Sequence, residues 1–274
     1  MGPPKPWSLC FHGRTFGSLS TTGQAKYRDP FEPMVPGISF IAFNDIAELE
    51  RQFDAGVCAL CIETIQGEGG IRPISKEFLT RAREITQKHN ALLILDEIQC
   101  GLGRTGKYFA YQHYSIKPDI VTVAKPLAAG LPLGAILLTN EAASAIHPGM
   151  HGTTFGGGPL VCSVALEVLR VTKSLLPKVR TTGAYFRKQL EALAKKHTSI
   201  REVRGLGLML ALDLHDAARA KSVAQQLLQQ RILINRTHET VLRFLPPFII
   251  EKKHIDQLIG ALDTALAAPT KVAA

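Results

Sequence analysis

The sequence lacks any apolar run of about eighteen residues, the length that a membrane-spanning helix needs. Its first ten residues, MGPPKPWSLC, lack the charged head and long apolar core of a signal peptide. Pro6 also stands where a myristoylation motif needs serine or threonine. These absences favour a cytoplasmic chain with no membrane partner.

Basic runs interleaved with aromatic residues are also absent, although the net charge is +9. The lysines and arginines are scattered along the chain, which is typical of a solvated surface. We therefore expect no nucleic-acid partner. An anionic small molecule would suit a few of these cations.

Cysteine is sparse, with five in 274 residues, which favours a reducing compartment over a disulfide framework. Cys58 and Cys61 form a CxxC within an apolar stretch that predicts a strand. Residues three apart on a strand face opposite sides, and no second pair follows at zinc spacing. We predict no metal site.

Strands and helices are predicted to alternate between residues 37 and 139. Continuous apolar runs predict strands, and the segments between them have helical periodicity, as in 75–90 with Ser75 as its N-cap. The predicted strands cover 37–43, 57–64, 91–97, 119–125 and 134–139. This pattern favours an α/β fold with a mainly parallel sheet that helices cover on both faces.

From about residue 160 the pattern changes to long helices followed by mixed elements. We predict two helices, 159–176 and 183–197, then one strand over 202–214. A helix, two short strands and a final helix follow. The sequence predicts a large domain over 1–160, and a connecting helix with a smaller α+β domain over 161–274.

Three of the predicted strands end in polar residues. They end at Glu63, at Asp96–Glu97 and at Lys125. Because functional groups gather at the carboxyl ends of parallel strands, Asp96 and Lys125 are expected on one rim. Pyridoxal phosphate needs a lysine amine for its Schiff base and a carboxylate for its ring nitrogen. An ordinary ion pair between Asp96 and Lys125 explains the placement equally well.

A second alternative is a dinucleotide site at GLGRTG, residues 101–106, which matches GxGxxG after a strand. The first glycine comes four residues beyond Glu97, and the next strand ends in Lys125 where an acid is needed. We therefore rank an oxidoreductase below the pyridoxal phosphate hypothesis.

Several spaced motifs resemble those of the class III pyridoxal-phosphate-dependent aminotransferases, and in particular their acetylornithine, ornithine and succinylornithine group. The resemblance covers almost the whole chain from Phe11. It rests on the segments FHGRTFGSLSTTG, ETIQGEGG, LLILDEIQCGLGRTG, PDIVTVAKPLAAGLPLGA, HGTTFGG, RGLGLML and RFLPP. It implies a fold-type I pyridoxal phosphate transferase.

The resemblance assigns the cofactor to one set of residues. Lys125 would carry it as a Schiff base and move the proton. Asp96 would pair with the ring nitrogen and Phe11 would stack on the ring. Gln99 would bond the phenolic oxygen. Glu97, Ile98 and Thr154 complete the cofactor set, with Thr154 reaching the neighbouring subunit of a homodimer.

The substrates are assigned to a second set. Arg14 would bind a substrate carboxylate, for which a planar bidentate donor is suited, and Thr153 would lie near the substrate. Glu68 and Arg243 resemble a gating pair that lets one site accept two differently charged substrates; a structural salt bridge is the alternative. The implied reaction transfers an amino group from N-acetylornithine to 2-oxoglutarate by a ping-pong mechanism, as in arginine biosynthesis.

Two features depart from the family pattern. Only ten residues precede Phe11, where family members have a long segment with a phosphate-binding loop, so we expect an N-terminally truncated chain. Gly158 replaces the asparagine of the usual TFGGN. An inactive fragment, and an aminotransferase for ornithine, succinylornithine or 4-aminobutyrate, therefore stay open as alternatives.

Overall fold

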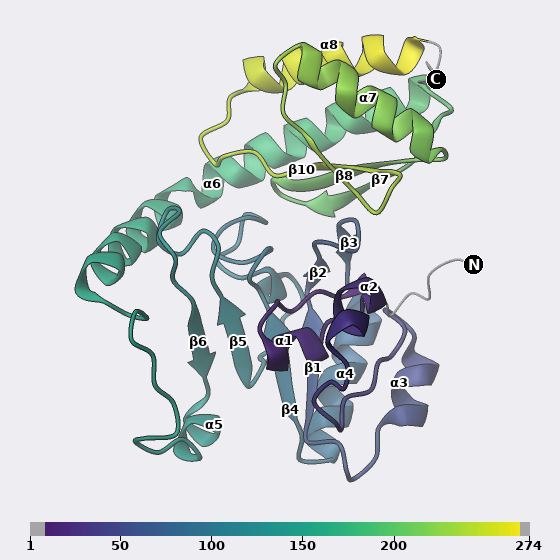
Figure 1. The fold of residues 1–274 in the computed structure, drawn as a ribbon. Coiled ribbons are helices and arrows are strands. Elements are labelled where there is room, and N and C mark those ends of the chain that lie inside the picture. The colour runs from purple at the N-terminus through teal and green to yellow at the C-terminus, as the bar shows by residue number, and fades with distance from the viewer. Residues whose placement is uncertain (1–8, 269–274) are drawn as a thin grey trace.

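The computed structural model describes residues 9–268, which form two bodies joined by one long helix (Figure 1). Residues 1–8, on which the targeting expectations rest, lie outside the described residues. The larger body contains a four-stranded sheet in the order β1-β4-β5-β6. Its strands are β1 (Ala59–Glu63), β4 (Leu92–Asp96), β5 (Ile120–Val123) and β6 (Ala135–Leu138). The first three are parallel and β6 is antiparallel to β5.

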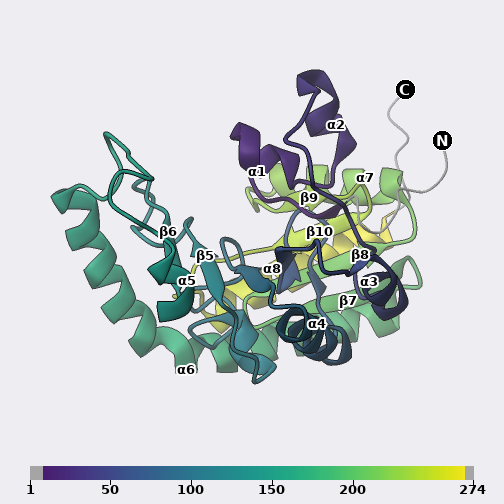
Figure 2. The ribbon, with the colours of Figure 1, turned by 90° about the horizontal axis from the view of Figure 1, so that it is seen from below.

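Helix α4 (Lys76–Lys88) covers one side of this sheet, while α1 (Phe16–Ser20) and α2 (Ala25–Arg28) lie on the other (Figure 2). The Ser75 side chain accepts a hydrogen bond from the backbone N–H of Phe78, so the predicted N-cap is confirmed. The apolar face of α4 is buried against the sheet. The smaller elements of this body are η2 (Asp29–Phe31), α3 (Ile46–Gln52), β2 (Ile65–Gln66), β3 (Arg72–Pro73), η3 (Ala110–His113) and α5 (Asn140–Ser144).

Residues 37–43 form no strand, so that expectation was wrong. A cavity of about 400 Å³ is lined both by this segment and by β1, and the ladder of β1 in the described structure is with β4. The segment is apolar enough for a strand, but the space between the two backbones keeps it out of hydrogen-bonding reach. A segment becomes a strand only when a neighbouring strand pairs with it, and the sequence of the segment does not show whether such a partner is present.

A single helix, α6 (Pro159–Lys196), replaces the two expected helices. Pro177 lies inside it and removes one backbone donor, which normally ends or kinks a helix. Here packing on both sides of the proline outweighs that cost. Ala165 packs in the core of the larger body, and Val179 and Phe186 pack in the core of the smaller one. The helix therefore belongs to both bodies, and the domain boundary near 160 stays a prediction.

The smaller body has an antiparallel sheet in the order β7-β8-β10-β9, covered by helices. The expected strand over 202–214 is in fact two strands, because the chain reverses at Gly207, which has a positive φ of 57°. The elements are β7 (Ile200–Leu206), β8 (Met209–Leu214), α7 (Ala217–Gln229), β9 (Asn235–Thr237), β10 (Val241–Phe244) and α8 (Lys252–Ala267). Within residues 9–268, no helix is both long and apolar enough to cross a membrane.

The carboxyl ends of β1, β4 and β5 point toward the smaller body (Figure 1). The larger sheet and the smaller sheet therefore enclose the rim on which the sequence places its polar residues.

Candidate active site

A cavity of about 180 Å³ lies at this rim. Glu63 and Asp96 are register partners at the ends of β1 and β4, and Lys125 follows β5. The expectation that three strand ends share one rim is confirmed. The residues that line the cavity are Phe11, His12, Gly13, Glu63, Asp96, Ile98, Gln99 and Lys125.

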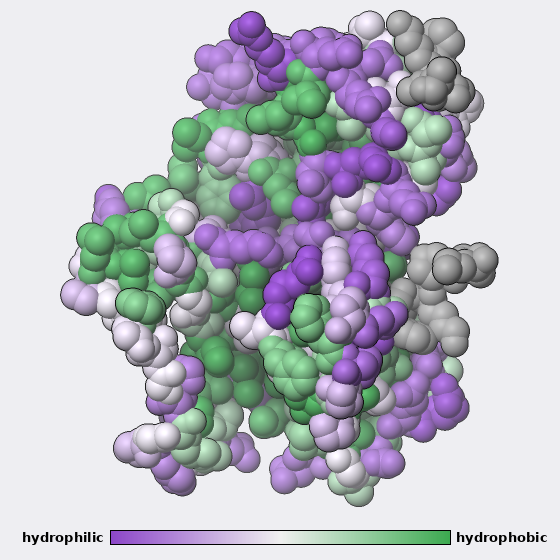
Figure 3. Space-filling view, viewed as in Figure 1, coloured by the Kyte–Doolittle hydropathy of each residue, from purple (hydrophilic) through white to green (hydrophobic). Residues whose placement is uncertain are grey.

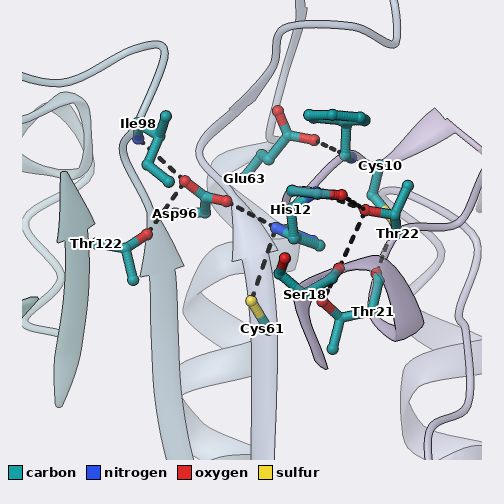
Figure 4. A network of polar contacts seen from close by, with 12 residues as sticks. Cys10, His12, Ser18, Thr21, Thr22, Cys61, Glu63, Asp96, Ile98 and Thr122 are labelled. Atoms are coloured by element: carbon teal, nitrogen blue, oxygen red, sulfur yellow. Dashed lines mark hydrogen bonds and ion pairs between the residues drawn. The ribbon is translucent and has the colours of Figure 1, made fainter. Parts of the chain in front are cut away.

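The Asp96 carboxylate is held at both oxygens (Figure 4). Its Oδ2 lies 2.8 Å from Nδ1 of His12. Its Oδ1 accepts from the backbone N–H of Ile98 at 3.0 Å and from the Thr122 hydroxyl at 3.2 Å. Three partners fix the orientation of this group. Sequence reasoning missed His12 and Thr122 as partners of Asp96, although His12 stands in the FHGR motif beside Phe11.

Glu63 is a further buried carboxylate that sequence reasoning placed on the rim without a role. Its oxygens accept from the backbone N–H groups of Phe11 and Gly67, each at 2.9 Å. Burial raises the pKa of Glu63 to about 7. Burial lowers the pKa of His12, but Cys61 and Asp96 raise it, and the net pKa lies above its usual range. Glu63 is therefore partly protonated near neutral pH.

Lys125 carries an amine that forms no ion pair within residues 9–268. Its side chain is partly exposed, and burial of the remainder lowers the pKa of the amine, although Glu68 and Asp96 act in the opposite direction. The alternative of an ordinary ion pair between Asp96 and Lys125 is therefore wrong for this structure. A lowered pKa leaves more of the amine neutral and able to act as a nucleophile or base.

Glu68 and Arg243 form the expected pair across the two bodies, with Arg243 Nη1 donating to Glu68 Oε1 at 2.8 Å. Burial raises the pKa of Glu68, but the hydrogen bond from Arg243 outweighs it and the net pKa is lowered. Gln99 touches both members, donating to Glu68 Oε1 at 3.2 Å and accepting from Arg243 at 3.4 Å. Whether the pair acts as a gate stays a prediction.

Phe11 and Arg14 occupy different positions relative to the cavity. Phe11 lines it and packs edge-on against Tyr27, with ring centroids 5.8 Å apart. Arg14 is exposed, and its guanidinium lies over the Tyr27 ring, 3.9 Å from the centroid. Arg14 does not line the cavity, so its role in binding a substrate carboxylate stays a prediction.

Glu97 lies next to Asp96 in sequence, but its carboxylate faces away from the cavity. It accepts from the backbone N–H groups of Ala110 and Tyr111 at 2.7 and 2.8 Å, and from the Thr64 hydroxyl at 3.0 Å. Its side chain is therefore not available to a ligand in the cavity. Successive residues point to opposite sides, so Glu97 points away from the cavity that Asp96 faces. Its hydrogen bonds hold the segment after β4 in place instead.

Thr153 and Thr154 are exposed in the segment before α6, and neither lines the cavity. The hydroxyl of Thr153 accepts from the backbone N–H of Gly156 at 3.1 Å. The role of Thr154 was expected at the site of a neighbouring subunit, which a single chain does not test. Both assignments stay predictions.

The GLGRTG turn has no room for a dinucleotide phosphate. A Cβ atom at Gly103 would lie 2.6 Å from Cγ2 of Thr172, and one at Gly106 would lie 2.5 Å from Cγ of Arg180. Both neighbours belong to α6. These glycines serve close packing of the turn against the helix, which excludes the dinucleotide alternative at this place.

The family model described as "Aminotransferase class-III" matches residues 6–266. The chain belongs to the class III aminotransferase family. The chain is 48% identical to the acetylornithine aminotransferase of Methanocaldococcus jannaschii over 92% of this chain and 64% of that protein. It is 42% identical to the succinylornithine transaminase of Yersinia pseudotuberculosis over 92% of this chain and 62% of that protein.

Solved structures agree with this class III aminotransferase assignment. The ornithine aminotransferase of Toxoplasma gondii, crystallised with oxidised glutathione and carrying PLP at partial occupancy at its active site, superposes with a TM-score of 0.88. It is 35% identical, over 94% of this chain and 62% of that one. The expected fold is confirmed. The chain spans about 64% of the length of its curated relative from Methanocaldococcus.

Pyridoxal phosphate is the cofactor of class III aminotransferases, and the residues of the cavity fit its ring and reactive carbon. The cavity brings together an amine without an ion pair, a fixed carboxylate, and the side chains of Phe11 and Ile98 as apolar walls. None of the eight lining residues is a serine or threonine that could bond a phosphate. The chemistry of this set therefore fits the ring end of the cofactor.

Proposed function

We propose that this chain carries the ring-binding and proton-transfer part of an aminotransferase site that uses pyridoxal phosphate. The observation that carries the proposal is the unpaired Lys125 amine in one cavity with the fixed Asp96 carboxylate. We assign N-acetylornithine as amino donor and 2-oxoglutarate as acceptor, because the acetylornithine aminotransferase of Methanocaldococcus is 48% identical. The 42% identity to a succinylornithine transaminase keeps other class III donors as the alternative.

Each residue has a defined part in this proposal. The bound cofactor supplies an electron sink for the substrate carbon that bears the reacting amine. Asp96, oriented by His12 and Thr122, would keep the ring nitrogen protonated, while Phe11 and Ile98 would confine the ring. Nζ of Lys125, with its lowered pKa, would accept the proton that leaves the substrate carbon bearing the reacting amine and return it later.

The Glu68–Arg243 pair gives the site a way to bind two kinds of substrate. Arg243 would bind the second carboxylate of 2-oxoglutarate, since a guanidinium matches a carboxylate in a planar fork. Glu68 would neutralise Arg243 when the amino donor, which has no second carboxylate, occupies the site. Gln99 forms hydrogen bonds to both side chains, so it would keep Glu68 or Arg243 in place when the two are not paired with each other.

A direct test is to mix the purified chain with pyridoxal phosphate, reduce with borohydride, and map the modified peptide. The modification is expected on Lys125, with a visible absorbance band before reduction that bleaches when glutamate is added. A folded protein that shows no band and no modified peptide would support the alternative of an inactive fragment.

We further propose that the chain acts as a homodimer in the cytoplasm. Phe155, in the segment before α6, is 92% exposed, and Leu160 and Leu166 on α6 are each 71% exposed. Figure 3 shows apolar side chains gathered over this part of the molecule. A surface of this kind favours association with a second copy. Light scattering should give a dimer mass, and Phe155→Asp should lower it, while Phe31→Asp at another exposed position should not.

A further inference from the structure

Arg104, in the GLGRTG turn, connects the two bodies of the molecule. Its Nη1 donates to the carbonyl oxygens of Pro246 and Leu208, both in the smaller body. Its guanidinium carbon lies 4.5 Å from the centre of the Phe248 ring. The backbone carbonyl of Arg104 also accepts from the N–H of Leu208 at 3.0 Å. The turn that resembles a phosphate-binding loop is thus an attachment point for the smaller body.

Arg104 is partly buried and has no carboxylate partner within residues 9–268. Burial alone lowers the pKa of its guanidinium to about 10. A buried charge without an opposite charge is costly, and a structural role in packing alone would be met by an apolar side chain. An arginine provides two things here that an apolar side chain does not. Its guanidinium is a strong donor that reaches a carbonyl of the other body, and its planar face packs on the Phe248 ring.

The carbonyl that Arg104 binds lies three residues after Arg243, at the exit of β10. Gln99, from the same segment after β4 as Arg104, bonds the side chain of Arg243. On the other side of the pair, the Thr237 hydroxyl in β9 donates to the backbone carbonyl of Glu68 at 3.0 Å. The backbones that carry Glu68 and Arg243 are therefore each tied to the opposite body.

We propose that Arg104 is a positioning residue for Arg243 and thereby a determinant of dicarboxylate binding. By holding the chain at Pro246, it fixes the distance of Arg243 from the cavity, so that the guanidinium reaches the second carboxylate of an oxo acid, which the amino donor lacks. This inference rests on the proposed function of Arg243. It also predicts that the Glu68–Arg243 pair opens by rotation of side chains, because both backbones are held.

The test compares two unreactive ligands by calorimetry on the protein loaded with pyridoxal phosphate. Glutarate has two carboxylates and needs Arg243. The other ligand, 2-acetamidopentanoate, is the amino donor without its reacting amino group and has one carboxylate. The variants are Arg104→Met, Arg104→Lys and Arg243→Met. Arg180→Met is the matched control, because Arg180 Nη1 donates to the carbonyl of Gly106 in the same turn but does not touch the β10 exit.

Arg104→Met is expected to weaken glutarate binding about tenfold, as loss of a charged hydrogen bond would. Binding of 2-acetamidopentanoate should change less than about twofold. Arg104→Lys, which keeps one donor, should recover part of the glutarate affinity, and it also serves if Arg104→Met does not fold. Arg180→Met should bind both ligands like the wild type.

Three results would overturn the inference, and they are distinguishable. If Arg243→Met loses glutarate but Arg104→Met and Arg104→Lys do not, Arg104 has no positioning role and the proposed function stands. If Arg243→Met keeps full glutarate affinity, the proposed role of Arg243 fails and this inference fails with it. An equal loss of both ligands in Arg104→Met would show a general structural role and also overturn it.

Discussion

Two polar clusters of this molecule hold their charges differently. In the smaller body, Arg204 donates to Asp213 and Glu202 at 2.8 Å each, and to the carbonyl of Gly70 at 2.8 Å. Arg204 and Asp213 are 6% and 2% exposed. At the rim of the larger sheet, Lys125 has no ion pair in the described structure, and burial raises the pKa of Glu63 to about 7.

This difference separates a structural cluster from a reactive one. Paired buried charges contribute to the fold, and removal of one partner leaves the other uncompensated. Groups left without a full set of partners at a cavity are free to bind and to exchange protons. The comparison predicts that substitutions at the rim change chemistry more than stability, and that substitutions at Arg204 do the reverse.

The largest effect is expected for Lys125→Met, measured as the rate of amino transfer from glutamate. Loss of the amine removes both the nucleophile and the base, so the rate should fall more than about 10³-fold. Lys117→Met removes one exposed lysine elsewhere on the larger body and is the control. Retention of more than about a tenth of the wild-type rate would contradict the role of Lys125.

The next largest effect is expected for Arg204→Met, measured as the free energy of unfolding in urea. It leaves Asp213 buried without its arginine, which should cost about 3–5 kcal/mol. Arg201→Met, at a more exposed arginine 3.8 Å from the same carboxylate, should cost less than about 1 kcal/mol. Equal losses in the two variants would show that burial of the pair does not matter.

The sequence predicted this rim because the end of a strand can be recognised from an apolar run that stops at a polar residue. Apolar runs that end in Glu63, Asp96 and Lys125 predicted parallel strands with polar carboxyl ends, and the three groups do meet. The resemblance placed Glu68 against Arg243, which lie in different bodies.

Other features depend on tertiary neighbours and could not be predicted from pattern. The helix through Pro177 continues because two cores bury its two ends. Segment 37–43 has strand composition, yet a cavity separates it from β1. The hydrogen bond of His12 to Asp96 joins residues 84 positions apart, so no local signal could indicate it. The resemblance assigned Glu97 to the cofactor together with Asp96. The side chains of these successive residues point to opposite sides, so only Asp96 faces the cavity.

A smaller effect, dependent on pH, is expected from Glu63. Because the pKa of Glu63 is raised from 4.5 to about 7, the native state binds more protons than the unfolded state. Its contribution to stability is therefore complete below pH 4.5 and is lost as the pH rises through about 7.

Glu63→Gln removes this titration. The free energy of unfolding of the wild type relative to Glu63→Gln should therefore fall by about 3 kcal/mol between pH 4.5 and pH 8. Urea unfolding of both proteins across this range measures the difference. Glu77→Gln, at an exposed position of α4, controls for removal of one carboxylate. A difference that does not vary with pH would place the proton elsewhere in the cluster.

The smallest effect is expected for the stability of Lys125→Met, the variant with the largest expected effect on activity. Lys125 is partly exposed and has no ion pair in the described structure, so its removal leaves no buried charge uncompensated. The free energy of unfolding should change by less than about 0.5 kcal/mol, within the range of surface substitutions. Urea unfolding of Lys125→Met beside Arg204→Met measures both sides of the comparison together. A loss of several kcal/mol in Lys125→Met would mean that the rim, like the Arg204 cluster, is built for stability, and the inactivation of this variant could then no longer be assigned to lost chemistry.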